Sequence, residues 1–175
     1  GIEHQQIFQK FLRKVKGHVD YRTLAAGIVA YRKAQVGVLE PYANVIPTLM
    51  RLKQRGLKLA IVSDAPRLKA WIRLVEMRLQ DFFDAVVCFE DTKQLKPNEL
   101  PFKTALQTLK VKPEEALMIG DRPDRDVEGA KMLGIKTVFA KYGATKPIEN
   151  SGADFEINSV EQIVEVADKV NAKLT

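Results

Sequence analysis

The order of apolar segments from residue 38 onward most strongly limits the folds open to this chain. Short runs rich in β-branched residues alternate with segments in which apolar residues recur at helical spacing. This alternation is typical of βαβ units and predicts an α/β fold, a Rossmann-like parallel sheet with helices on both faces. The predicted strands are 57–62, 85–89, 116–119, 136–140 and 155–157, and the predicted helices are 42–54, 66–78, 98–109, 123–133 and 159–173.

The first 37 residues follow a different pattern. Apolar residues recur at helical spacing in 3–16 and again in 20–35, and no strand pattern lies between them. Gly17 and Gly37 follow the two segments, as expected at helix ends. We therefore predict two domains, a helical lobe at 1–37 and an α/β core at 38–175.

Charge and composition exclude several partners. The 175 residues carry a net charge of +6, but the basic residues are scattered and interleaved with acidic ones. Because no stretch combines basic and aromatic residues, we expect no nucleic-acid partner and instead an attraction for small anionic substrates. No apolar stretch is long enough to span a bilayer, and the N-terminal residues do not resemble a signal peptide. We therefore expect no membrane partner and a cytoplasmic location. The single cysteine, Cys88, is interpreted as a small buried apolar residue.

Two polar positions stand where a parallel sheet binds ligands, at the carboxyl ends of its strands. Ser63 and Asp64 directly follow strand 57–62, where a hydroxyl and the backbone N–H groups of the next helix could hold an anion. The alternative is that Ser63 or Asp64 only caps that helix. Lys96 precedes helix 98–109, and its ammonium could neutralise a phosphate together with an attacking carboxylate. The alternative is an exposed lysine before the turn residue Pro97.

An acidic segment follows strand 116–119. Gly120 leads into Asp121, and a second carboxylate, Asp126, follows five residues later, where a helix is predicted to begin. Hard oxygen ligands gathered at a strand end suit Mg²⁺, which binds one or two carboxylates and keeps several waters. The alternative is an acidic turn in which Asp121, Asp124 or Asp126 caps the helix, although Asp121 precedes the turn.

Ser63, Lys96 and the Gly120-Asp121…Asp126 segment, in this order, resemble the haloacid dehalogenase (HAD) superfamily. The resemblance runs from about Val38 to Tyr142 and is closest to archaeal phosphatase-like members with a helical cap. The first two helical segments resemble the second half of such a cap.

The resemblance implies a Mg²⁺-dependent hydrolase that acts on a small phosphate monoester through an aspartyl-phosphate intermediate. Ser63, Lys96 and the backbone of Asp64 would bind the phosphate, and Ser63 and Lys96 would also take part in catalysis. Asp121 would bind Mg²⁺ directly, and Asp126 would act through a water or by orienting its neighbours. The alternative is a catalytically inactive member that serves as a phosphate- or partner-binding module.

The superfamily's Asp-x-Asp segment, at the end of a buried strand near the N-terminus, is not found in this sequence. The only aspartate before strand 57–62 is Asp20, which lies between two helical segments. In the superfamily the absent strand lies between the strands predicted here at 57–62 and 116–119. Three explanations stay open: the chain is the remainder of a longer one, a second copy or another chain fills the gap, or the protein is an inactive relative. We expect little phosphatase activity from the chain alone, and as partners a small phosphorylated metabolite and the missing N-terminal segment or a second copy.

Overall fold

The computed structural model describes residues 7–36 and 39–172, which belong to two compact units, 1–40 and 41–175. The first unit contains helices α1 (Ile7–Lys16) and α2 (Tyr21–Val36). Residues 3–6 of the first predicted helix lie outside the described residues. The identification of this unit with part of a cap stays a prediction.

The two helices of the first unit pack against each other through a small apolar contact. The rings of Phe8 and Tyr31 meet edge to face, with centroids 5.7 Å apart, and Leu12 and Leu24 are buried. Asp20 supports the start of α2, since its carboxylate accepts the backbone N–H of two residues of the first turn.

All five predicted strands are present in the second unit, and every pairing is parallel. Among the described residues they form two sheets, one with the order β1-β2 and one with the order β3-β4-β5. No ladder of hydrogen bonds joins β1 to β3 in this part of the chain, so the strands do not form one continuous sheet. The strands are β1 (Ala60–Val62), β2 (Ala85–Val87), β3 (Leu117–Gly120), β4 (Lys136–Ala140) and β5 (Phe155–Ile157).

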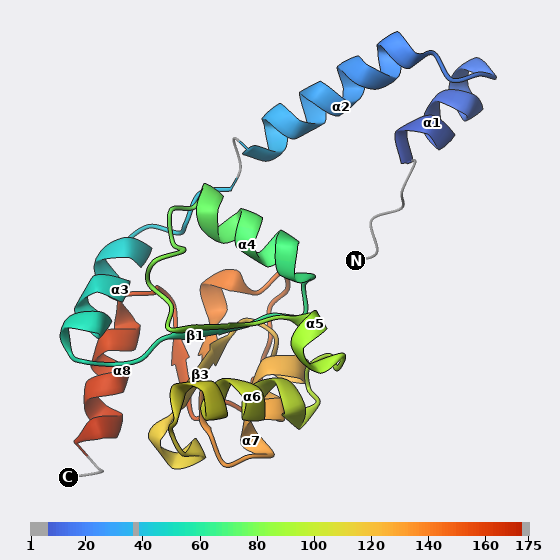
Figure 1. The fold of residues 1–175 in the computed structure, drawn as a ribbon. Coiled ribbons are helices and arrows are strands. Elements are labelled where there is room, and N and C mark those ends of the chain that lie inside the picture. The colour runs from blue at the N-terminus through green and yellow to red at the C-terminus, as the bar shows by residue number, and fades with distance from the viewer. Residues whose placement is uncertain (1–6, 37–38, 173–175) are drawn as a thin grey trace. The chain divides into compact units, whose positions relative to one another are not determined.

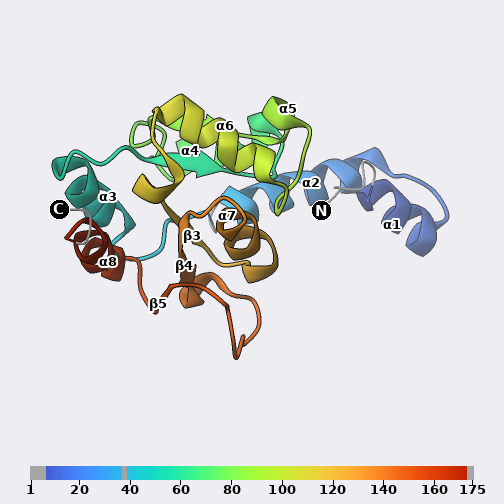
Figure 2. The same ribbon diagram turned by 90° about the horizontal axis from the view of Figure 1, so that it is seen from below.

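Helices cover both faces of these strands, which confirms the predicted α/β class. Helices α3 and α8 lie together on one side, and α6 and α7 lie on the other (Figures 1 and 2). The helices of this unit are α3 (Val45–Gln54), α4 (Arg67–Glu76), α5 (Phe89–Thr92), α6 (Glu99–Leu109), α7 (Glu128–Lys131) and α8 (Gln162–Asn171). Short 3-10 turns occupy η1 (Pro113–Glu115) and η3 (Lys141–Gly143).

The helix predicted at 123–133 is not continuous. A π-helical turn, η2 (Pro123–Val127), precedes α7. Asp126 folds back on Arg122, because its backbone N–H donates to the Arg122 carbonyl at 2.6 Å and its carboxylate accepts the Arg122 N–H at 3.1 Å. The local bonds of one aspartate thus replace the first regular turn of the expected helix.

Two apolar clusters hold the helices on the strands. One joins α3 and α8 to β4 and β5, and its buried members are Leu52, Val138, Ala140, Ile157, Ile163, Val164, Val166 and Ala167. The other joins α6 to α7, and its buried members are Phe102, Leu106, Ala130 and Ile135. Cys88 is also buried, as predicted. Within the described residues no helix combines the length and apolar character that a membrane span requires.

Candidate active site

Lys96 bridges the carboxyl ends of β1 and β3. Its Nζ donates to the carbonyl oxygen of Val62, the last residue of β1, at 2.9 Å and to Asp126 Oδ1, just beyond β3, at 2.6 Å. The side chains of Lys96 and Asp126 are only 12% and 6% exposed. The interpretation of Lys96 as an exposed lysine is therefore wrong. An ammonium group has three N–H donors, so one remains for an acceptor at this point.

Asp64 connects the loop after β1 to both of the other site segments. Its Oδ1 accepts the backbone N–H of Lys96 at 2.9 Å, and its Oδ2 accepts a bond from the Arg125 guanidinium in η2. Because both oxygens are engaged, the side chain positions the segments that carry Lys96 and Asp126. The phosphate-binding role predicted for the Asp64 backbone does not require either side-chain oxygen and stays a prediction.

Ser63 stands at the end of β1 with its hydroxyl available. Its N–H donates to the Val87 carbonyl at 2.8 Å, which extends the pairing with β2, and its Oγ accepts the Ala65 N–H at 3.2 Å. Among the described residues no acceptor takes the hydroxyl proton, so that proton can be donated to an anion. Helix α4 begins later, and Glu90 rather than Ser63 or Asp64 accepts the N–H of its first residue, Arg67. The interpretation of Ser63 or Asp64 as the helix cap is wrong.

The two predicted metal ligands of the acidic segment, Asp121 and Asp126, lie in different environments. Asp126 is 4% exposed, and its two oxygens are occupied by Lys96 and by the Arg122 N–H. The Asp121 carboxylate is half-buried, and within the described residues it accepts no hydrogen bond and forms no ion pair. The two predicted ligands, five residues apart in the sequence, therefore differ in whether a carboxylate oxygen is free.

Glycines make room for both carboxylates. A Cβ on Gly120 would lie 2.2 Å from Asp126 Oδ2, and a Cβ on Gly143 would lie 2.8 Å from the Cβ of Asp121. Any other residue at these two positions would displace a carboxylate. The close approach of Asp126 to the strand end therefore depends on Gly120.

The carboxylates of the acidic segment fit a Mg²⁺ site only in part. Asp121 offers a free carboxylate at a strand end, the type of ligand that Mg²⁺ takes, whereas Asp126 fits only an indirect role. In the described part of the chain no three His, Cys, Asp or Glu side chains gather as a metal site. One direct protein ligand, Asp121, is thus available from these residues.

Most of the predicted site residues lie in one network. Lys96, Asp64 and Asp126 are joined by hydrogen bonds, Ser63 adjoins Asp64, and Asp121 lies between two residues that contact Asp126. The structure records no contact between the Ser63 side chain and the Lys96–Asp126 pair. Sequence reasoning missed the Val62 carbonyl and Arg125, because nothing in the charged run 124–126 indicates which side chain turns back toward β1.

Known proteins resemble this chain over most of its length. It is 35% identical over 167 residues to a glyceraldehyde 3-phosphate phosphatase of Methanocaldococcus jannaschii, a match that spans 95% of this chain and 73% of that protein. It is 32% identical over 136 residues to the pyrophosphatase PpaX of Bacillus anthracis, across 77% of this chain and 62% of the relative.

Solved structures share the fold. A HAD phosphatase from Thermococcus onnurineus superposes with a TM-score of 0.66 and 34% identity, over 71% of this chain and 57% of that one. The chain therefore spans little more than half of that structure. The sequence family described as haloacid dehalogenase-like hydrolase matches residues 1–140. By this match, and by its 35% identity to a phosphatase of the same type, the chain belongs to the haloacid dehalogenase-like hydrolases.

Proposed function

We propose that the site at the ends of β1 and β3 belongs to a Mg²⁺-dependent phosphohydrolase that acts on a small phosphate monoester through an aspartyl-phosphate. The observation that carries this proposal is the position of Lys96. A nearly buried ammonium spans two strand ends, keeps one N–H unused and lies beside the segment that carries the free Asp121 carboxylate. Such preorganised charge suits phosphoryl transfer, in which positioning and electrostatic stabilisation supply most of the catalysis.

The reaction has two steps. An aspartate carboxylate attacks phosphorus and displaces the alcohol, which takes a proton from a second aspartate acting as general acid. Water then attacks the phosphorus of the aspartyl-phosphate, gives its proton to that second aspartate, and releases inorganic phosphate with the first carboxylate restored. The family resemblance implies that both aspartates come from an Asp-x-Asp segment, and within residues 1–175 no such segment directly follows a predicted strand.

The predicted site residues would have different roles. The Ser63 hydroxyl and the Asp64 N–H would donate to phosphate oxygens, and Lys96 would neutralise charge between the nucleophile and the phosphate. Asp126 holds Lys96 in place, and Asp121 would bind the metal. When bound, Mg²⁺ would offset the negative charge of the phosphate and the carboxylates.

The substrate class follows from the relatives. Two proteins similar to this chain carry the names glyceraldehyde 3-phosphate phosphatase and pyrophosphatase, and the former matches at higher identity over more of the chain. We therefore propose a small phosphorylated metabolite as the substrate, with glyceraldehyde 3-phosphate as the first compound to test.

The test is phosphate release from glyceraldehyde 3-phosphate and from pyrophosphate, with Mg²⁺ and with a chelator. The chain is assayed alone and together with a segment that bears Asp-x-Asp. We expect Mg²⁺-dependent release only when the segment is present, and a loss of about 100-fold or more for Lys96→Ala and Asp121→Asn. Asp124→Asn is the matched control, because Asp124 is an exposed aspartate of the same segment that pairs with Arg122.

The second candidate is an inactive phosphate- or partner-binding module. Such a module would use Lys96 and Ser63 to bind phosphate and would need no Asp-x-Asp directly after a strand, which residues 1–175 do not contain. Phosphate binding that depends on Lys96, without turnover when the Asp-x-Asp segment is supplied, would support the module and contradict the enzyme. Full activity of the chain alone would contradict the proposed source of the nucleophile.

A further inference from the structure

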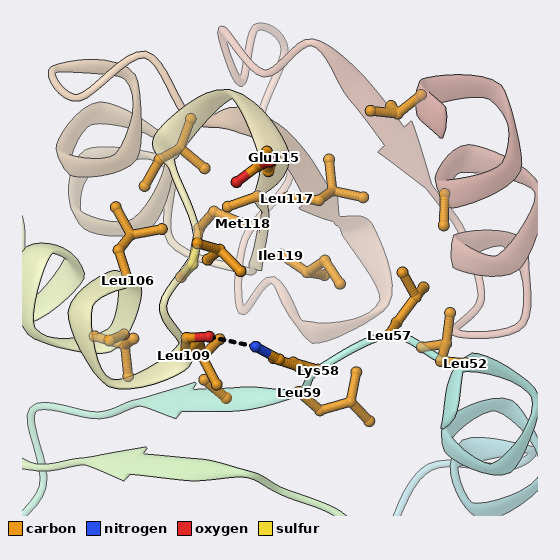
Figure 3. Close-up of a pocket in the computed structure, with 18 of the residues that line it drawn as sticks. Leu52, Leu57, Lys58, Leu59, Leu106, Leu109, Glu115, Leu117, Met118 and Ile119 are labelled. Carbon is orange, nitrogen blue, oxygen red and sulfur yellow. Dashed lines mark hydrogen bonds between the residues drawn. The ribbon is translucent and has the colours of Figure 1, made fainter. Parts of the chain in front are cut away.

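An apolar groove of about 350 Å³ lies between β1 and β3. Figure 3 shows Leu57 and Leu59 on one side of it and Leu117, Met118 and Ile119 on the other. By the family resemblance a strand lies at this position, so the groove calls for no new occupant. That strand does not account for another exposed apolar surface, which lies on helix α4.

Helix α4 carries apolar side chains on two faces. Ala70 and Leu74 are buried, so they belong to the face that packs on the rest of the unit. Four further apolar residues recur at intervals of three and four positions and therefore share a different face. This face, called the α4 stripe, consists of Leu68, Trp71, Ile72 and Val75, which are 73%, 38%, 46% and 57% exposed. The α4 stripe takes no part in lining the groove.

The composition of the α4 stripe indicates a contact surface. A surface helix normally turns one apolar face toward the core, and a second apolar face is typical of a helix that is covered on both sides. Single exposed apolar residues are common, but four that adjoin on one helix form a patch that marks an interaction site. Trp71 strengthens this interpretation, because tryptophan is enriched at the centre of protein–protein contacts.

The α4 stripe is nearly symmetric about the point between Trp71 and Ile72. Leu68 precedes this point, and Val75 follows it, by the same number of positions. A two-fold axis here, perpendicular to the helix, would place Leu68 opposite Val75 of a second copy and Trp71 opposite Ile72 of that copy. Each apolar residue would then meet another apolar residue, which is the self-complementarity that a two-fold interface requires.

The charges at the two ends of α4 favour the same antiparallel arrangement. At the first turn, Glu90 accepts the N–H of Arg67 at 2.8 Å and Asp91 pairs with its guanidinium, so two carboxylates accompany one cation. At the other end two cations accompany one carboxylate, namely Arg73 and Arg78 with Glu76. Antiparallel helices place each acidic end beside a basic end and also oppose the helix dipoles.

These charges favour a second copy over an anionic membrane surface as the partner. A helix that lies in a membrane interface carries Lys and Arg along its polar face, whereas carboxylates are present at both ends of α4. The contact would involve one helix face per copy, which is less than a standard protein–protein interface. A reversible dimer is therefore expected rather than an obligate one.

We propose that α4 binds α4 of a second copy of this chain in an antiparallel arrangement, with a two-fold axis near Trp71 and Ile72. This second copy differs from one that would fill the gap between β1 and β3, because a different surface holds it. The proposal is also independent of the proposed function, since the residues of the α4 stripe are not among those of the candidate active site.

Sedimentation velocity of the full chain at increasing concentration tests the association. We expect a monomer–dimer equilibrium with a Kd of about 100 µM or tighter. A matched pair of variants tests its location. Ile72→Lys places a charge in the α4 stripe and should weaken association by about tenfold or more. Ile119→Lys, the same substitution at a 39% exposed isoleucine of the groove, should leave the Kd unchanged. Circular dichroism first shows that both variants are folded.

Cysteine cross-linking tests the antiparallel geometry. Cys88 is the single natural cysteine and is buried, so an introduced cysteine supplies the accessible thiol. The thiol of Ile72→Cys would lie near the two-fold axis and should form a disulfide with its own counterpart on mild oxidation. The two copies of Leu68 would lie about 10 Å apart along the helices, too far for a disulfide. Leu68→Cys should therefore cross-link to Val75→Cys in a mixture of the two variants, but not to itself.

Several outcomes would overturn the inference. They are a chain that stays monomeric at about 100 µM, unchanged association of Ile72→Lys, loss of association in Ile119→Lys, and self-cross-linking of Leu68→Cys, which would indicate parallel helices. Binding of the chain to phosphatidylserine vesicles without self-association would make a membrane the partner of the α4 stripe and would also overturn it. A dimer that shows the predicted cross-links and depends on Ile72 would support it.

Discussion

Strands β3 and β4 are neighbours, and β3 is the more apolar of the two, yet β4 is the more deeply buried. From Thr137 to Ala140, β4 is at most 5% exposed, whereas β3 is only partly buried and Ile119 is 39% exposed. The difference is that β4 has a partner on each side and β3 has one. Apolar composition alone therefore does not bury a strand of a parallel sheet. Burial also requires that both of its edges be covered.

The largest expected effect comes from placing a charge in each strand. Val138→Asp should destabilise the protein by about 4–5 kcal/mol, because Val138 is completely buried and the carboxylate would have no partner. Ile119→Asp should cost about 1 kcal/mol, since water reaches this position. Urea unfolding of the two variants measures the difference. Equal losses would mean that β3 is as buried as β4 and would remove the basis of the comparison.

The next largest effect concerns the lysine that connects the two sheets. Lys96→Met would leave the nearly buried Asp126 carboxylate without its cation and should destabilise the protein by about 3 kcal/mol. Adding Asp126→Asn should restore at least about 1 kcal/mol, since the uncompensated charge is then removed. Thermal unfolding of the two single variants, Lys96→Met and Asp126→Asn, and of the double variant tests this. If the double variant is as unstable as the sum of the single ones, the pair is not coupled.

A smaller effect is expected at Asp154, the residue just before β5. Burial would raise the pKa of Asp154, but hydrogen bonds from Lys136 and Thr137 outweigh it and lower the pKa from 3.8 to about 2. The carboxylate thus stabilises the fold above about pH 4, and this contribution is lost as the pH falls from about 4 to about 2.

Asp154→Asn should therefore cost roughly 1–2 kcal/mol at pH 7 and should remove this part of the acid dependence. The measurement is urea unfolding from pH 7 to pH 2. Asp81→Asn, at an exposed aspartate outside the strands, is the control. An unchanged acid profile in Asp154→Asn would show that the bonds to Thr137 and Lys136 do not stabilise the carboxylate.

The smallest effect is expected at the contact between α3 and α8. Arg55, at the end of α3, pairs with Asp168 of α8 at 2.9 Å, but the two side chains are 38% and 53% exposed. Exposed ion pairs contribute little, so Arg55→Ala should leave the urea midpoint unchanged within error. A clear loss would show that this pair contributes to the packing of α3 against α8 as much as their apolar contacts do.

Several elements could be predicted almost to the residue. Strands 136–140 and 155–157 have the expected bounds, because each is a short apolar run between turns. The helix α5 was not predicted, and strand 85–89 ends at Val87 instead. Here Asp91 accepts the backbone N–H of Cys88 at 2.8 Å and starts a helical turn at Phe89, a local side-chain bond that the apolar run does not reveal.

The sequence by itself determined the order of strands and helices and the residue types at the strand ends, since both follow from local periodicity and from short segments such as Gly120-Asp121. Only the tertiary structure decided that Lys96 joins the Val62 carbonyl to Asp126, which lies 30 residues further along the chain, and that an apolar groove lies between β1 and β3. The physical reason is that periodicity records which face of an element is apolar. It does not record which edges find a partner, and pairing between distant strands is settled only when the chain packs.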